Sequence, residues 1–377
     1  HIDKKVNFRV KNKLSRISFH CATMNTKLVS FVLTILLSDF VNSATFENVT
    51  VLLTTQLGKL FLYGKPPIAA IFIPSSETLT DYINHQPLEV VTIRNQKIPK
   101  LVENSLSNLS NIVHLSIISS GVTELEPGTF KNVPKLDGLN LEGNLIKEIK
   151  NGVFTGLQVK FIYLNNNKIS IIENNAFNNM TLTLISLNNN RISAWNTNWF
   201  LGSPVGSIYI AKNRLEEVPP HAFDFGLKFK RLNVPLTVWN VVLAQNRIKK
   251  VHKDAFKHVN GFGYLSLADN HLQELPPEVF HSVKNINTLD LTNNNLGHVN
   301  GVFDDININQ LILLNNSLSC FPMEVFDIST ISYVFVDGNP FTCVCVERWK
   351  NFQIQNNVWV VYNMKNLENN CNEKFLV

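Results

Sequence analysis

The stretch that decides the fold is residues 136–157, LDGLNLEGNLIKEIKNGVFTGL. Its apolar residues first alternate, at Leu139 and Leu141, as they do in a short strand with one buried face. Asn144 then interrupts the pattern, and apolar residues resume at wider spacing, as though the chain had turned a corner. One such segment cannot bury its apolar face alone, so we predict that it is one coil of a solenoid.

The same pattern recurs along most of the chain. It begins at residues 88, 112, 136, 159, 182, 205, 238, 262, 286, 308 and 331, which predicts about eleven coils. The ninth position is most often an asparagine, whose amide can satisfy backbone groups that the turn leaves unpaired inside the stack. These ninth-position residues, called here the buried ladder, are Asn144, Asn167, Asn190, Asn213, Asn246, Asn270, Asn294, Asn316 and Asn339.

A phenylalanine near position 19 is expected to fill the core from the far side of each coil. The residues are Phe130, Phe154, Phe177, Phe200, Phe223, Phe256, Phe280 and Phe326.

The consensus LxxLxLxxNxIxxIxxxxFxxL, over residues 88 to about 350, resembles the typical extracellular leucine-rich repeat family. The resemblance implies an α/β solenoid shaped as a horseshoe, with a parallel sheet on the concave side and irregular or short helical segments on the convex side. In style the chain is similar to secreted arthropod members related to Toll ectodomains, chaoptin and Slit. Many of these carry the label of a non-catalytic subunit of a luciferin monooxygenase.

Residues outside the repeats are assigned by composition. Residues 24–44 form a predicted secretory signal peptide, with Lys27 before an apolar run and small residues before the cleavage point. Residues 1–23 precede Met24 and are interpreted as an untranslated or non-native leader. Residues 45–87 are expected to form an N-terminal cap, with Ile68, Ile71 and Ile73 as a degenerate first coil. Residues 88–338 hold the repeats, and residues 339–377 hold the last coil and a cysteine-rich cap.

The charge of the folding part excludes some partners. The chain carries 34 Lys and Arg against 29 Asp and Glu, but residues 1–44 contain seven of the bases and two of the acids. Residues 45–377 therefore have 27 of each, which argues against a nucleic-acid or anionic-membrane surface. The run in the signal is too short for a membrane span, and no longer apolar run follows it, so no membrane insertion is expected after cleavage.

Cysteines and sequons support an exported protein. Cys320, Cys343, Cys345 and Cys371 cluster in the last 58 residues, which predicts two disulfides in an oxidising compartment. Because Cys320 and Cys343 both take position 13 of successive coils, geometry favours Cys320–Cys343 and Cys345–Cys371. The family resemblance instead favours Cys343–Cys371. Sequons for N-glycosylation occur at Asn48, Asn108, Asn179 and Asn315.

No catalytic constellation, cofactor motif or metal site is predicted. His114, His221, His252, His258, His271, His281 and His298 occupy different coils and fit no ligand or triad spacing, so they are interpreted as turn or surface residues. An insertion of about ten residues near Phe225–Pro235 is expected to form a surface loop, with either a binding role or none.

Function is therefore expected from the outward positions of the concave sheet. In the middle coils these carry large apolar and aromatic side chains with a polar border, as in the core and rim of an interface. The predicted partner-binding residues are Phe161, Tyr163, Leu184, Tyr209, Trp239, Val242 and Tyr264. Tyr333 and Phe335, near the end of the chain, are expected to be covered by the cap.

These features predict a secreted, non-enzymatic protein that binds an extracellular protein in innate immune recognition, adhesion or matrix assembly. Two alternatives stay open: a scaffolding subunit of a secreted enzyme, and a truncated receptor ectodomain.

Overall fold

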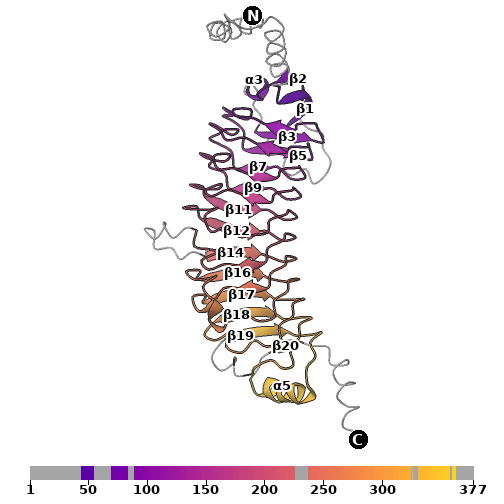
Figure 1. The fold of residues 1–377 in the computed structure, drawn as a ribbon, viewed down its shortest axis with the longest axis vertical. Helices are drawn as coiled ribbons and strands as arrows, with labels where there is room; N and C mark the ends of the chain where they lie inside the picture. The colour runs from indigo at the N-terminus through magenta and orange to yellow at the C-terminus, as the bar shows by residue number, and fades with distance from the viewer. Residues whose placement is uncertain are drawn as a thin grey trace, which may run out of the picture.

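A computed structural model describes residues 44–54, 69–83, 89–225, 237–323, 325, 330–356 and 359–361. Figure 1 shows an elongated stack of coils, each of which places one strand in a long sheet. The predicted leader and almost all of the predicted signal peptide lie outside the described residues. Among the helices that the structure describes, none is both long and apolar enough to cross a membrane.

The long sheet has 14 strands in the order β2-β1-β3-β5-β7-β9-β11-β12-β14-β16-β17-β18-β19-β20. Each predicted coil supplies one of its parallel strands, and β20 adds another after the last coil. The repeat strands are β3 (Val90–Arg94), β5 (His114–Ile118), β7 (Gly138–Asn140), β9 (Phe161–Tyr163), β11 (Leu182–Ser186), β12 (Val205–Tyr209), β14 (Thr237–Val242), β16 (Gly261–Ser266), β17 (Asn285–Asp290), β18 (Asn307–Ile312) and β19 (Thr330–Phe335), and β20 is Trp359–Val361. The predicted solenoid with one long parallel sheet is confirmed.

Beyond the turn that follows each sheet strand, several coils form a second, shorter strand. Three parallel pairs join neighbouring coils there: β4 (Lys100–Leu101) with β6 (Glu124–Leu125), β8 (Glu148–Ile149) with β10 (Ile171–Ile172), and β13 (Glu217–Val218) with β15 (Lys250–Val251). A short 3-10 helix, η4, spans Pro277–Phe280. The second side of the coils is therefore partly β-structure, where the resemblance implied only irregular or helical segments.

The buried ladder connects each coil to the one before it. In Asn190, Nδ2 donates to the carbonyl oxygens of Leu164 and Leu187, both at 3.0 Å, and Oδ1 accepts from the N–H of Ile169 at 2.9 Å. Leu164 and Ile169 belong to the preceding coil, whereas Leu187 lies in the coil of Asn190 itself. One side chain thus satisfies three buried backbone groups on both sides of the junction.

Phenylalanine rings form a stack inside the solenoid. Centroids lie 5.8 Å apart for Phe130 and Phe154, 5.6 Å for Phe154 and Phe177, and 5.3 Å for Phe177 and Phe200. A second stack of rings consists of Phe223, Phe256, Phe280 and Phe303. The sequence pattern did not predict Phe303 as part of it. Phe326 lies outside the described residues.

Phe225 joins the two runs of rings. Its ring lies 5.1 Å from Phe200 and 5.9 Å from Phe223, and its side chain is buried. The predicted insertion therefore starts with a core residue, and the rest of the predicted insertion, residues 226–235, lies outside the described residues.

The N-terminal end differs from the prediction. β1 (Phe46–Thr54) pairs antiparallel with both β2 (Ala69–Ser76) and β3, and the short helix α3 (Thr80–Ile83) follows. A degenerate first coil would have run parallel to its neighbour, so that interpretation is wrong. The antiparallel strand pairs with the end of the parallel sheet, and Val51 and Leu53 close the first core layer.

The disulfide Cys320–Cys345 corrects the pairing expected from geometry. The coil pattern stops at Asn339, and the helix α5 (Cys343–Asn356) begins where a continued coil would have placed Cys343 beside Cys320. The helix instead buries Cys345, with its Cα 5.5 Å from that of Cys320. Cys343 is also disulfide-bonded, and Cys371 lies outside the described residues.

Candidate functional site

The outward side chains of the long sheet form two rows, set by the register of the parallel strands. One row runs through position 3 of each coil and includes Phe161, Leu184, Ser207, Asn240 and Tyr264. Between the rows lie the buried position-4 residues, because side chains of a strand alternate between its faces.

The second row runs through position 5. It includes Tyr163, Ser186, Tyr209, Val242 and Ser266.

The register brings the predicted binding residues together in part. Phe161 lies beside Leu184, and Tyr209 lies beside Val242. Tyr163 and Tyr209 lie on either side of the buried Ser186, which places them roughly 10 Å apart along the sheet. The backbone of Trp239 is part of β14, but the structure does not describe the position of its side chain.

Four aromatic residues of this face have no ring partner among the described residues. Phe161, Tyr163, Tyr209 and Tyr264 are each half-buried. Among the described residues no ring stacks on any of them, although stacked rings are common in the core. Stacking of one ring on another across strands therefore does not explain why they occupy the outward rows.

Tyr264 is held at the edge of the aromatic region. Its hydroxyl donates to Oδ2 of Asp290 at 3.1 Å, while Oδ1 of Asp290 accepts from the Thr292 hydroxyl at 2.6 Å. Burial raises the pKa of the Tyr264 hydroxyl, and the negative charge of Asp290 raises it further. Asp290 and Thr292 thus form a polar boundary with fixed geometry.

Tyr333 is not covered as expected. It is 41% exposed, although Phe335 in the same strand is half-buried. The described part of the cap places β20 beside β19 in the same sheet, where it extends the edge of the sheet.

Position 8 forms a second column of asparagines, which the sequence interpretation missed. Asn189 donates to Asn166 at 2.7 Å, and Asn315 donates to Asn293 at 2.8 Å. Position 8 is left-handed in successive coils, including Gly143, Asn166, Asn189, Lys212, Gln245, Asp269, Asn293, Asn315 and Gly338, with φ between 52° and 76°. Left-handed backbone favours glycine and asparagine, which explains the composition. We call this set the exposed column.

The four sequon asparagines, Asn48, Asn108, Asn179 and Asn315, are all exposed. Asn315 belongs to the exposed column, beside the strand face.

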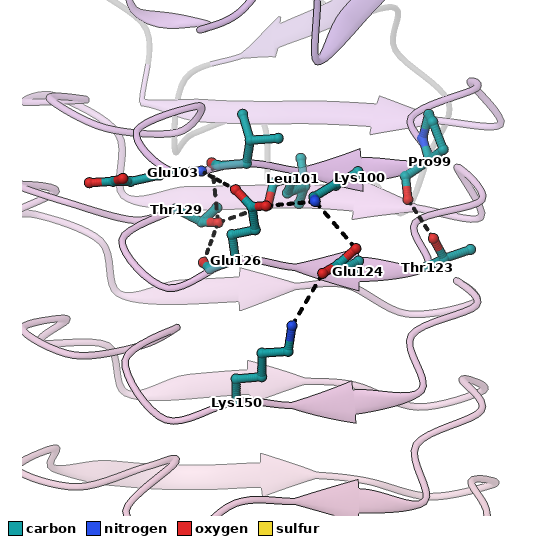
Figure 2. Close-up of polar contacts among 10 residues, drawn as sticks. Pro99, Lys100, Leu101, Glu103, Thr123, Glu124, Glu126, Thr129 and Lys150 are labelled. Atoms are coloured by element: carbon teal, nitrogen blue, oxygen red, sulfur yellow. Dashed lines mark hydrogen bonds and ion pairs between the residues drawn. The ribbon is translucent and has the colours of Figure 1, made fainter. Parts of the chain in front are cut away.

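An ion-pair network joins three coils at the short strands (Figure 2). Lys100 Nζ lies 2.6 Å from Glu126 and 3.4 Å from Glu124, and Lys150 Nζ lies 3.2 Å from Glu124. Hydrogen bonds from Lys150 and from Lys100 lower the pKa values of Glu124 and Glu126 respectively, and the hydrogen bond to Glu126 raises that of Lys100. All four side chains are about a third to two-fifths exposed, so the network links coils and forms no enclosed site.

Comparison with a protein-family model agrees with the repeat geometry. The leucine-rich repeat model matches residues 110–169, 238–296 and 263–318. These segments are leucine-rich repeats. The chain is also similar to the crystal structure of a leucine-rich repeat protein from Bacteroides eggerthii, with 17% identity and a TM-score of 0.49. That similarity covers 67% of this chain and 43% of the other, so this chain spans less than half of that protein.

Proposed function

We propose that this leucine-rich-repeat protein binds an extracellular protein through the strand face of its middle coils, β9 to β16. Leucine-rich repeats are generally protein-binding scaffolds. The observation that carries the proposal is the set of half-buried aromatic side chains, Phe161, Tyr163, Tyr209 and Tyr264, that have no ring partners within the described solenoid. Aromatic residues are enriched among the side chains that dominate binding energy at protein interfaces.

The arrangement of the face supports a protein partner. The two rows present apolar groups across neighbouring strands, and Asp290 with Thr292 forms a polar edge. A polar rim around an apolar centre is the usual anatomy of a protein interface, because the rim excludes water from the contacts at the centre.

Three features support export, and with it an extracellular partner. The structure has a disulfide between Cys320 and Cys345, and disulfides form and persist in oxidising compartments. The exposed sequon asparagines and the signal-like residues 24–44 agree with the same route. Innate immune recognition, adhesion and matrix assembly are the settings that we propose for this binding.

A capture experiment tests the proposal. Purified protein is immobilised and exposed to native extracellular fluid, and the retained proteins are identified by mass spectrometry. We expect Tyr163→Ala combined with Tyr209→Ala to lose a partner that the wild type retains, by about tenfold or more. Recovery of a catalytic chain as that partner would favour the scaffolding alternative.

The matched control removes apolar surface away from the sheet. Ile171 is 54% exposed and Leu201 is 46% exposed, and neither lies in the long sheet. Ile171→Ala combined with Leu201→Ala should leave capture unchanged. Loss of the partner with this pair, and not with the tyrosine pair, would place binding on the other side of the solenoid.

A further inference from the structure

Two histidines that are 37 residues apart in the chain meet in the structure. His221 follows β13 and His258 follows β15, and because these short strands pair in parallel, their following turns lie one above the other. The two imidazole rings are stacked, with centroids 6.1 Å apart. Both residues lie in turns, as the sequence analysis expects, but their spacing in the chain did not indicate that the two rings meet.

Asp224 completes the cluster. Its Oδ2 lies 2.8 Å from His221 Nδ1. The potential ligand atoms of His221, Asp224 and His258 all lie within 4.8 Å of one another. Two imidazoles and a carboxylate are thus gathered from two neighbouring coils.

Backbone hydrogen bonds hold the cluster in place. The N–H of His221 donates to the carbonyl oxygen of Asp254 in the next coil at 3.0 Å, and the N–H of Asp224 donates to that of His221 at 3.2 Å. Because these bonds fix the backbone of His221 and Asp224, the two side chains can reorient toward a bound ion without a change in the backbone.

A separate observation concerns the second carboxylate oxygen of Asp224. Oδ1 of Asp224 is buried and has no hydrogen-bond partner within the described part of the chain. A buried carboxylate oxygen without a hydrogen-bond partner is unfavourable, because burial removes it from water. A cation bound beside His221 would supply the contact that this oxygen lacks.

We infer that His221, Asp224 and His258 form a binding site for a divalent transition-metal ion of the zinc class. Imidazole nitrogen and carboxylate oxygen are ligands of Zn²⁺, whereas Ca²⁺ and Mg²⁺ prefer sets made of oxygen alone. His258 is exposed, so an ion can enter from solvent. Three protein ligands leave a coordination position for water or for a side chain of a partner.

The bound ion would link two coils of the solenoid. His221 and Asp224 belong to the coil that begins at residue 205, and His258 belongs to the next. A ligand that binds only the folded state stabilises it, so metal should raise the midpoint of thermal unfolding. Stabilisation of the solenoid by a bound ion does not depend on whether the strand face binds a protein.

The test is calorimetric titration of the full-length, tag-free protein with ZnCl₂ after treatment with a chelator. We expect one site in the wild type and a loss of affinity of about tenfold or more in His258→Ala. The exposed His271 lies outside the cluster, so His271→Ala is the matched control and should bind as the wild type does. MgCl₂ should produce no comparable heat.

A second measurement separates metal binding from folding. Zinc should raise the unfolding midpoint of the wild type and of His271→Ala, but not those of His258→Ala or Asp224→Asn, while circular dichroism without metal should be alike for all four. Equal zinc affinity in the wild type and His258→Ala would overturn the inference. So would the absence of any zinc binding by correctly folded wild type.

Discussion

The buried ladder and the exposed column place asparagine at neighbouring positions of the same coils for different physical reasons. Asn190 is 8% exposed, and its amide satisfies three backbone groups. Asn189, one residue earlier, is exposed and has φ of 55°. The amide of Asn190 is therefore required for its hydrogen bonds, whereas Asn189 is favoured chiefly by its backbone conformation. Asparagine therefore recurs in this repeat for two separate reasons: hydrogen bonding to buried backbone groups at one position, and a left-handed backbone conformation at the other.

The largest effect is expected from breaking the buried ladder. Asn190→Ala removes the partner of the Ile169 N–H and of two carbonyl oxygens, all inside the stack. We expect a loss of about 3 kcal/mol in the free energy of unfolding, measured by urea denaturation. A loss below about 0.5 kcal/mol would mean that water replaces the amide, and that the ladder is not the main link between coils.

A smaller effect is expected in the exposed column. Asn189→Val places a β-branched residue in a left-handed conformation, and it should reduce the free energy of unfolding by about 1 to 2 kcal/mol. Asn189→Gly is the matched control, because glycine adopts this φ freely, and it should lie within a few tenths of a kcal/mol of the wild type. If the glycine variant is as unstable as the valine variant, the hydrogen bond to Asn166 matters more than the backbone.

The smallest effect is expected at the solvent-exposed ion-pair network. The pKa values of Glu124 and Glu126 lie below their ordinary value of 4.5, so their contribution to stability is present above that pH and is lost as the pH falls through the lowered values. Lys100 has a raised pKa, so its contribution is present below pH 10.5 and is lost as the pH rises through the raised value.

Because these side chains are partly exposed, solvent screens each pair to about 1 kcal/mol or less. Glu124→Gln should therefore reduce stability slightly at pH 7 and make no difference at a pH well below 4.5. Urea denaturation of both proteins at the two pH values measures this. A difference that persists in acid would assign the effect to packing of the side chain and not to its charge.

The repeat pattern allowed much of the fold to be predicted. Strand, turn and core positions of each coil follow from local spacing, because every coil repeats the same contacts with its neighbours. Prediction failed where the repeat stops. The antiparallel pairing of β1 and the burial of Cys345 by α5 depend on how nonrepeating segments pack against the end coils. A periodic sequence pattern carries no information about that packing.

The candidate site was predictable in part. Alternation identified the outward residues, such as Phe161 and Tyr209, and the coil starts align them with the same positions of the neighbouring strands. Spacing along the chain did not indicate how deeply each of these side chains is buried. The 33-residue step between Asn213 and Asn246 obscured the alignment of His221 with His258.

The sequence by itself determined the solenoid, its asparagine ladder and the rows of side chains that face outward, because period and polarity are local properties of the chain. Only the tertiary structure decided which cysteine pairs with Cys320, and that His221, Asp224 and His258 lie together. The physical reason is that these contacts join residues separated by a coil or more, and stacking alone sets their distances.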